Sequence, residues 1–83
     1  MYKLLISSKA ERQLKKIPKD HKRAILEALA DIKEEPFLGK PLTRNLTGRL
    51  SYRVGVYRIV YRIKVKDNTI EVLTAGHRSV VYN

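Results

Sequence analysis

Three basic side chains, Arg53, Arg58 and His77, have the types and spacing to bind a phosphate group. Gly55 and Val56 lie at the centre of SYRVGVYR, a pattern typical of a two-residue hairpin, which places Arg53 directly opposite Arg58. Like charges facing each other across two strands destabilise a sheet. A phosphate bound between two arginines relieves that repulsion and accepts hydrogen bonds from both guanidinium groups. The pair therefore predicts a preorganised anion site.

A solvated surface is the competing interpretation of the same pattern. Exposed strand faces often carry arginine for solubility, and surface arginines can splay apart. The overall charge adds weight to the anion site, because 18 Lys and Arg against eight Asp and Glu give a formal charge of +10. Such a field favours a polyanionic partner. Nucleic acid is the first candidate, an anionic membrane surface the second and an acidic protein the third.

Length and composition predict a single small domain, residues 1–83. The absence of cysteine excludes a disulfide scaffold and a thiolate zinc site, and two histidines argue against a metal enzyme. No apolar run approaches the roughly 20 residues of a membrane helix, and MYKLLISSKAERQ is charged too early for a signal peptide. We therefore expect a soluble, cytoplasmic protein with no metal, no small-molecule cofactor and no membrane partner.

The N-terminal half predicts one strand and two helices that could position the basic residues. Residues 2–6 form a short apolar run typical of a strand. Ser8 precedes Glu11 with the spacing of a capping box, so a helix is expected to start there and to end near Ile17, before Pro18.

A second helix is expected over residues 21–35, with Asp20 as its cap and Pro36 as its stop. An apolar stripe runs along it, formed by Ile25, Leu29 and Ile32 with Ala24 and Ala28 beside them. Because only a few residues join the two helices, we expect an antiparallel helical hairpin that packs through this stripe.

The C-terminal half predicts three strands after an irregular connection over residues 36–48. Apolar and aromatic residues alternate with polar ones in LSYRV and YRIVYRIK, and TIEVLTAGH returns after a turn at Asp67-Asn68. Its Ile70, Val72 and Thr74 are expected on the aromatic face. The predicted fold class is α+β, with element order β-α-α-β-β-β and the helical hairpin packed on one face of a small, antiparallel-rich sheet.

A two-residue second turn would set the register of the last strand. Lys64 would then pair with Glu71, and Arg58 would lie beside His77. Arg53, Arg58 and His77 would form one row across three strands. Strict alternation would put Arg78 on the opposite face from His77.

The combination of RVGVYRIVY with GHRSVVY, in this order of elements, resembles the RelE/ParE toxin superfamily, specifically the RelE-like mRNA interferases. The resemblance covers essentially the whole chain, and the two motifs together are specific although each alone is weak. It implies the microbial-RNase-like toxin fold of a type II toxin–antitoxin toxin. It also implies cleavage of mRNA in the ribosomal A site, with the ribosome, mRNA and a cognate RelB-like antitoxin as partners.

The same resemblance assigns functional residues by motif. The catalytic candidates are Arg58, Arg78, Tyr82 and His77, and the candidates for binding RNA phosphates are Arg49, Arg53, Arg62 and Lys64. RNA supplies its own nucleophile, the 2′-hydroxyl, so the enzyme needs to remove that proton, stabilise the phosphorane and protonate the leaving 5′-oxygen, without a metal. Tyr82 and His77 both remain candidates for the general base.

Two other functions fit the same fold. A ParE-like toxin would inhibit DNA gyrase without cutting RNA, and a plain nucleic-acid-binding module would show steep salt dependence and no cleavage. Basic residues on the predicted helices could contact ribosomal RNA or could simply be solvated, and the second interpretation is favoured. They include Lys15, Lys16, Lys19, Lys22 and Arg23.

Overall fold

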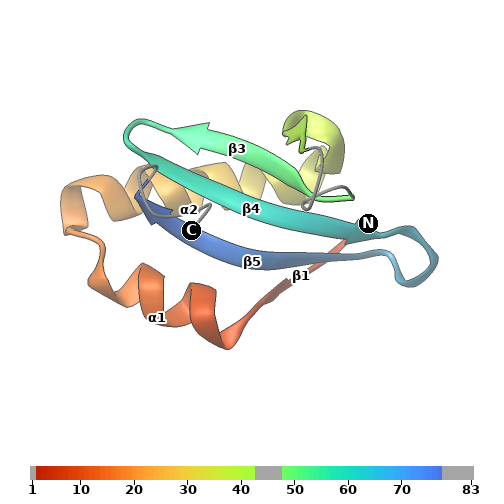
Figure 1. Ribbon diagram of the computed structural model, residues 1–83, viewed down its shortest axis with the longest axis horizontal. Coiled ribbons are helices and arrows are strands. Elements are labelled where there is room, and N and C mark those ends of the chain that lie inside the picture. The colour runs from red at the N-terminus through yellow and green to blue at the C-terminus, as the bar shows by residue number, and fades with distance from the viewer. Residues whose placement is uncertain (1, 43–47, 78–83) are drawn as a thin grey trace.

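Two helices cover one face of a five-stranded sheet in the computed structural model, which describes residues 2–42 and 48–77 (Figure 1). The strand order is β1-β5-β4-β3-β2, with β1 parallel to β5 and the other neighbours antiparallel. The elements are β1 Lys3–Ile6, α1 Ser8–Lys16, α2 Lys19–Glu34, the 3₁₀ turn η1 Pro36–Leu38, β2 Lys40–Pro41, β3 Leu50–Val54, β4 Tyr57–Lys64, the 3₁₀ turn η3 Val65–Asp67 and β5 Thr69–His77. The predicted α+β class is confirmed, and the short strand β2 is an addition within the predicted irregular connection.

Helix α1 begins at Ser8, as the sequence predicted, but its N-cap is the residue before it. Ser7, not Ser8, is the N-cap, and its Oγ accepts a hydrogen bond from the Ala10 N–H at 3.0 Å. The helix ends at the C-cap Ile17, directly before Pro18, as predicted. Ala10 and Leu14 are its buried residues and face the core.

Helix α2 runs antiparallel to α1 across the sheet and carries the predicted apolar stripe (Figure 1). Pro18 is its N-cap and provides no side-chain hydrogen bond, so Asp20 lies in the first turn and is not the cap. The stripe is buried at Ile25, Ala28, Leu29 and Ile32. Ala24 is exposed, so the stripe is narrower than predicted.

The hairpin of β3 and β4 has the register that the sequence predicted. Arg53 pairs with Arg58, and Val54 pairs with Tyr57. Gly55 has φ +60°, the positive angle that a type II′ turn requires at its first central position. A side chain there would be strained, so glycine at this position helps to fix the register of the two arginines.

The register between β4 and β5 differs from the prediction for two reasons. The turn is the 3₁₀ turn η3 followed by Asn68 in the left-handed region at φ 49°, not a two-residue turn, and Lys64 therefore pairs with Thr69, not with Glu71. A β-bulge then shifts the pairing between Val60 and Tyr61. Because of this shift, Thr74 pairs with Val60 and leaves the aromatic face on which it was expected.

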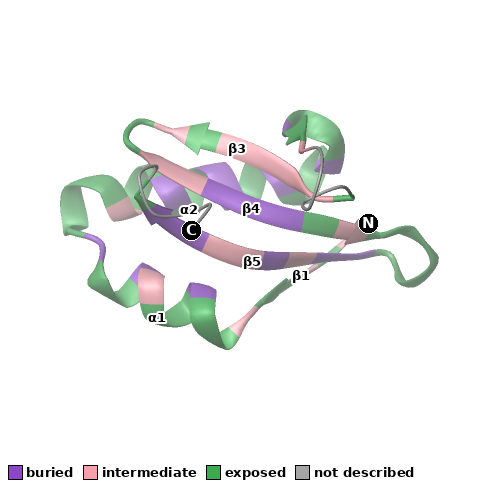
Figure 2. Cartoon of the chain, in the orientation of Figure 1, coloured by how far each residue is buried: buried purple, intermediate pink, exposed green. Residues whose placement is uncertain are grey.

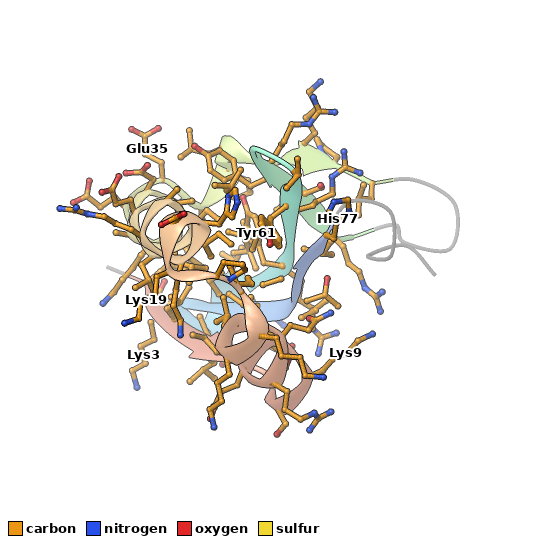
Figure 3. The ribbon with its side chains drawn as sticks, turned by 90° about the vertical axis from the view of Figure 1, so that its left-hand side faces the viewer. Lys3, Lys9, Lys19, Glu35, Tyr61 and His77 are labelled. Carbon is orange, nitrogen blue, oxygen red and sulfur yellow. The ribbon has the colours of Figure 1, made fainter. Side chains whose placement is uncertain are left out.

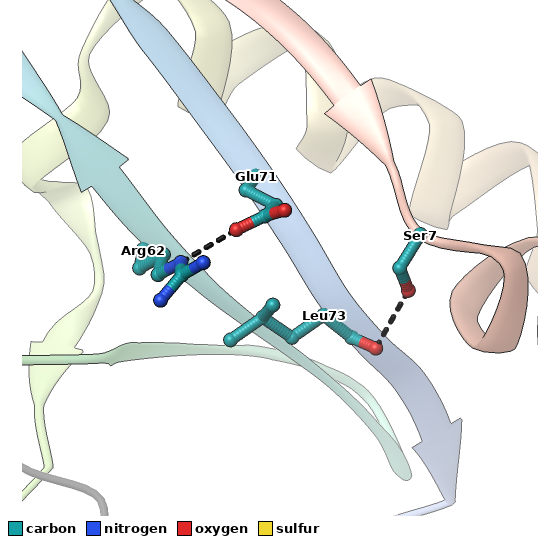
Figure 4. A network of polar contacts seen from close by, with 4 residues as sticks. All are labelled: Ser7, Arg62, Glu71 and Leu73. Atoms are coloured by element: carbon teal, nitrogen blue, oxygen red, sulfur yellow. Dashed lines mark hydrogen bonds and ion pairs between the residues drawn. The ribbon is translucent and has the colours of Figure 1, made fainter.

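Beyond the end of β1, backbone N–H and C=O groups on the free edge of β5 form hydrogen bonds with α1 and its N-cap residue. The last β1–β5 pair joins Ile6 and Val72. Ser7 continues the edge, since its N–H donates to the Val72 carbonyl at 2.9 Å and its Oγ–H donates to the Leu73 carbonyl at 2.9 Å (Figure 4). The Ala75 N–H donates to Gln13 Oε1 at 2.9 Å. The helix thus satisfies backbone groups that a neighbouring strand would otherwise pair.

The core lies between the helices and the sheet, and Figure 2 shows it in the central strands β4 and β5 and at intervals along α2. Its fully buried members with the largest side chains are Tyr61, Ile25, Ile32, Ile59, Ile70 and Val72. One face of the sheet is therefore committed to packing, and the other is available to position polar groups.

Among the helices of the described segments, none is long and apolar enough to cross a membrane.

Candidate functional site

The face of the sheet opposite the helices carries Arg53 and Arg58 side by side. The two residues are a direct cross-strand pair, in which Cβ atoms are typically about 5 Å apart. Tyr57 and Ile59, which flank Arg58 in β4, pack on the helix side, so alternation directs Arg58 to the opposite, open face. Arg53 is exposed and Arg58 is half-buried. The arrangement places two arginine side chains next to each other on the open face, where both line one groove.

His77 does not join this pair, so the predicted three-residue row is wrong. The bulge places Gly76 opposite Arg58, and His77 pairs with Tyr57. The rings of His77 and Tyr57 lie 6.0 Å apart in an edge-on contact, and the His21 ring of α2 lies 5.2 Å from the Tyr57 ring. His77 therefore belongs to an aromatic cluster at the helix side of the sheet. A one-residue shift moved its side chain to the other face.

The other predicted phosphate contacts extend the open face along the strands. Arg62 and Lys64 follow Arg58 at alternate positions of β4, and Arg49 precedes Arg53 by four residues. Arg62 already has a partner, because its Nε lies 2.5 Å from Glu71 Oε1 on β5 (Figure 4). Exposed ion pairs of this kind contribute little to stability, but the carboxylate offsets the charge of Arg62.

A groove of about 500 Å³ on this face continues from the arginine pair toward β2. It is lined by Leu38, Lys40, Pro41, Leu42, Ser51, Tyr52, Arg53 and Arg58. Lys40 pairs with Ser51, which is two residues before Arg53 in β3, so Lys40 shares the face of the arginines. Sequence reasoning placed Lys40 in an irregular connection. The cue that could have found it is the Lys-Pro pair, since proline is tolerated on an edge strand.

Tyr61 connects β4, the strand that carries Arg58, to residues 36–39, which form one wall of the groove through Leu38. Its hydroxyl donates to the Pro36 carbonyl at 2.7 Å and accepts from the Gly39 N–H at 2.9 Å. Burial raises the pKa of the Tyr61 hydroxyl above its ordinary value of 10.0, while the Gly39 hydrogen bond opposes that rise. Figure 3 shows Tyr61 in the interior, whereas Lys3, Lys9 and Lys19 project outward. The tyrosine is thus a neutral structural link.

Gly39 is required for this link because the chain approaches Tyr61 closely. A Cβ atom at Gly39 would lie 2.7 Å from the Tyr61 hydroxyl and 3.0 Å from the Ser51 carbonyl. The first distance is too short for a carbon atom and the second is a tight contact, so the absence of a side chain lets η1 and β2 pack against β3 and β4.

Two catalytic candidates, Arg78 and Tyr82, lie outside the described residues. Within residues 2–42 and 48–77, no group of three His, Asp or Glu side chains is arranged to hold a metal ion. The part of the site that can be described therefore consists of the arginine pair and the basic groove beside it.

Comparison with known proteins assigns the chain to a family. A sequence model described as the ParE toxin of the type II toxin–antitoxin system parDE matches residues 4–82. Toxin RelG of Mycobacterium tuberculosis is 39% identical over 83 residues, which cover 98% of this chain and 95% of the relative. The chain belongs to the RelE/ParE toxin superfamily. Toxin RelE of the same organism is 34% identical and covers 98% of this chain and 86% of its own length.

Solved structures support the same assignment for this RelE-family toxin. The toxin–antitoxin complex RelBE2 from Mycobacterium tuberculosis contains a chain with a TM-score of 0.85 and 38% identity, covering 93% of this chain and 98% of that one. The isolated Escherichia coli RelE toxin gives a TM-score of 0.81 at 21% identity, covering 99% of this chain and 92% of its own, and shows the common fold. The family and fold predicted from the motifs are confirmed.

Proposed function

We propose that this RelE-family toxin is a metal-independent endoribonuclease that cleaves mRNA in the ribosomal A site and so inhibits translation. The observation that carries the proposal is the direct pairing of Arg53 with Arg58 on the open face of the sheet. Two adjacent cations are costly in the free protein and become favourable when an anion binds between them. The similarity to the relatives named toxin RelG and toxin RelE supports a toxin of the RelE family.

The chemistry starts from the 2′-hydroxyl of the nucleotide before the cut. A base removes its proton, the 2′-oxygen attacks the neighbouring phosphorus, and the bond from phosphorus to the 5′-oxygen breaks as that oxygen receives a proton. The products are a 2′,3′-cyclic phosphate and a 5′-hydroxyl. Arg58 and Arg53 would donate hydrogen bonds to the phosphate oxygens, with Arg78 as a further donor, and would stabilise the extra negative charge of the phosphorane.

The proton-transfer role goes to Tyr82 in this proposal. His77 and Tyr82 were equal candidates from the sequence, but the β4–β5 register pairs His77 with Tyr57, on the face opposite Arg58. Tyrosine ordinarily has a pKa near 10, so it serves as a base only where neighbouring cations lower that value. A catalytic Tyr82 would therefore need cations near its hydroxyl, and His77 would act by packing.

The test is cleavage of an mRNA positioned on 70S ribosomes, mapped by primer extension. Arg58→Ala should abolish cuts at the A-site codon, and Tyr82→Phe should reduce them at least about 100-fold, the usual contribution of a positioned acid or base. His77→Gln should retain most activity. Arg23→Ala is the matched control, because it also removes one positive charge but lies on the exposed surface of α2. Activity in Arg58→Ala equal to that of Arg23→Ala would contradict the assignment.

A ParE-like inhibition of DNA gyrase is the second candidate, because the matching family description is that of a ParE toxin. It would not depend on the arginine pair. This function would replace the nuclease if the wild-type protein cut neither ribosome-bound nor free mRNA, and if both the wild type and Arg58→Ala inhibited gyrase supercoiling.

The proposed partner is a cognate RelB-like antitoxin, as in the RelBE2 complex of the similar chain. A segment that is acidic or amphipathic would complement the +10 charge of the toxin. Co-expression of the toxin with the neighbouring reading frame, followed by purification of one stable complex, tests the pairing.

A further inference from the structure

The groove beside the arginine pair combines positive charge with exposed apolar surface. Among the lining residues that belong to the described segments, Lys40, Arg53 and Arg58 are cationic and none is acidic. Leu38 lies two residues before Lys40 and is 42% exposed, and Leu42 lies two residues after it. A ligand that matches this surface carries negative charge next to an apolar group.

The cations are spaced along the strand. Lys40 pairs with Ser51, and Arg53 is the next residue of β3 on the same face, about 7 Å further along. Lys40 is therefore offset along the strand direction from the arginine pair, on the same face, so that one chain of phosphates can contact both positions. A polymer with repeated phosphates satisfies both positions at once.

The groove wall is held in place before any ligand arrives. Tyr61, which is three residues after Arg58 in β4, hydrogen-bonds to Pro36 and Gly39 at either end of the segment that carries Leu38. The distance between the wall and the arginine pair is thus fixed by β4 itself. A preformed site loses less free energy on binding than one that must be ordered.

We propose that Leu38, Lys40 and Leu42 form a nucleotide-binding subsite that holds the RNA residue adjacent to the phosphate at Arg53 and Arg58. The base or ribose packs on the two leucines, and Lys40 contacts the next phosphate. This subsite rests on the proposed function, because it takes the RNA of that reaction as its ligand. It adds Lys40 and the two leucines to the residues that recognise the substrate.

Binding of a short, 5′-fluorescein-labelled RNA blocked by 2′-O-methyl groups measures the subsite without cleavage. Lys40→Ala should weaken binding about fourfold at 0.15 M salt. The plot of the logarithm of the association constant against the logarithm of the salt concentration should become less steep by about 0.7, the value for one lost phosphate contact on a single strand. Lys66→Ala is the matched control, since Lys66 is an exposed lysine of η3 at the other end of β4. It should leave affinity within about twofold, because it removes only screened charge.

The apolar part is tested with the same RNA carrying an abasic site at each position in turn. One position should weaken binding to wild type and have no effect on Leu38→Ala, because the lost base and the lost side chain make the same contact. Equal affinities of Lys40→Ala and Lys66→Ala, or the same abasic profile in wild type and Leu38→Ala, would overturn the subsite. Loss of antitoxin binding without loss of RNA binding in Lys40→Ala would overturn it as well, by assigning the groove to an acidic peptide.

The ribosome assay separates failure of the subsite from failure of the nuclease. If wild type cuts in the A site while Lys40→Ala binds RNA like the control, the subsite is wrong and the nuclease stands. If RNA binding depends on Lys40 and Leu38 but nothing is cut, the groove is a nucleotide site and the nuclease is wrong.

Discussion

At the scale of single residues, the fold supports the paired arginines by fixing their surroundings, with Arg53 exposed and Arg58 half-buried. Like charges paired across two strands repel each other, and the glycine turn and the core residues on the other face of the same strands determine the register that keeps Arg53 and Arg58 paired.

Tyr61 offers the clearest prediction at this scale. Tyr61→Phe leaves the Pro36 carbonyl and the Gly39 N–H without their hydroxyl partner, which should lower the free energy of unfolding by about 2 kcal/mol. Urea unfolding of both proteins at neutral pH measures it. Tyr2→Phe is the control, because it removes a hydroxyl from a half-exposed tyrosine. An unchanged unfolding midpoint in Tyr61→Phe would show that the link does not hold the groove wall.

The contribution of the Tyr61 hydroxyl to the free energy of unfolding should also depend on pH. Burial raises the pKa of Tyr61 in the folded protein above 10.0, so the folded state holds this proton more tightly than the unfolded chain. The contribution is complete below pH of about 10, the pKa in the unfolded chain, and is lost as pH rises through the folded pKa. The difference in stability between wild type and Tyr61→Phe should therefore be constant in the neutral range and shrink in alkaline urea titrations. A difference that grows with pH would contradict it.

At the scale of elements, the decisive feature is the bulge in β5 and the way in which α1 caps that strand. Gln13 Oε1 accepts a hydrogen bond from the N–H of buried Ala75, and the Ser7 hydroxyl donates one to the Leu73 carbonyl. These contacts stabilise a strand whose pairing has shifted, and the shift determines that Gly76, not His77, faces Arg58.

Gln13→Leu should destabilise this edge without changing the core. The Ala75 N–H would lose its acceptor, at a cost of about 2 kcal/mol, and its amide hydrogen should exchange faster with solvent. Hydrogen exchange monitored at Ala75 by NMR measures the effect. Gln13→Glu keeps an oxygen acceptor at the same place and should preserve most of the protection. Equal protection of Ala75 in wild type and Gln13→Leu would mean that Gln13 does not cap the strand.

The elements also show what the sequence can and cannot predict. The Arg53–Arg58 pairing followed from a local turn signal, and both helices followed from apolar spacing and prolines. The β5 register depended on two features without a local signal: a 3₁₀ turn ending in left-handed Asn68, and a bulge stabilised by a glutamine 62 residues away in sequence. Lys40 was missed for the same reason, because its strand exists only through pairing with β3.

At the scale of the whole molecule, the question is whether the +10 charge acts as a general field or through its arrangement. Basic residues also occupy the helix surface, where Lys16 and Lys19 are exposed beside the turn between α1 and α2. A field extends only about 8 Å through physiological salt, so distant lysines contribute to encounter more than to the bound state.

Two double variants with the same net charge separate these possibilities. Arg53→Ala/Arg58→Ala and Lys16→Ala/Lys19→Ala each remove two positive charges, the first from the open face and the second from the helix surface. In dilute buffer both should slow association with the 2′-O-methyl RNA, because the Debye length reaches about 30 Å at 0.01 M salt. At 0.15 M salt only the arginine variant should bind more weakly, by roughly 14-fold for two lost phosphate contacts, and only it should lose cleavage on ribosomes. If both variants lost affinity equally at 0.15 M salt, net charge would control binding and the paired arginines would have no special role. If the lysine variant alone lost cleavage, the helix surface would be the part of this toxin that contacts the ribosome.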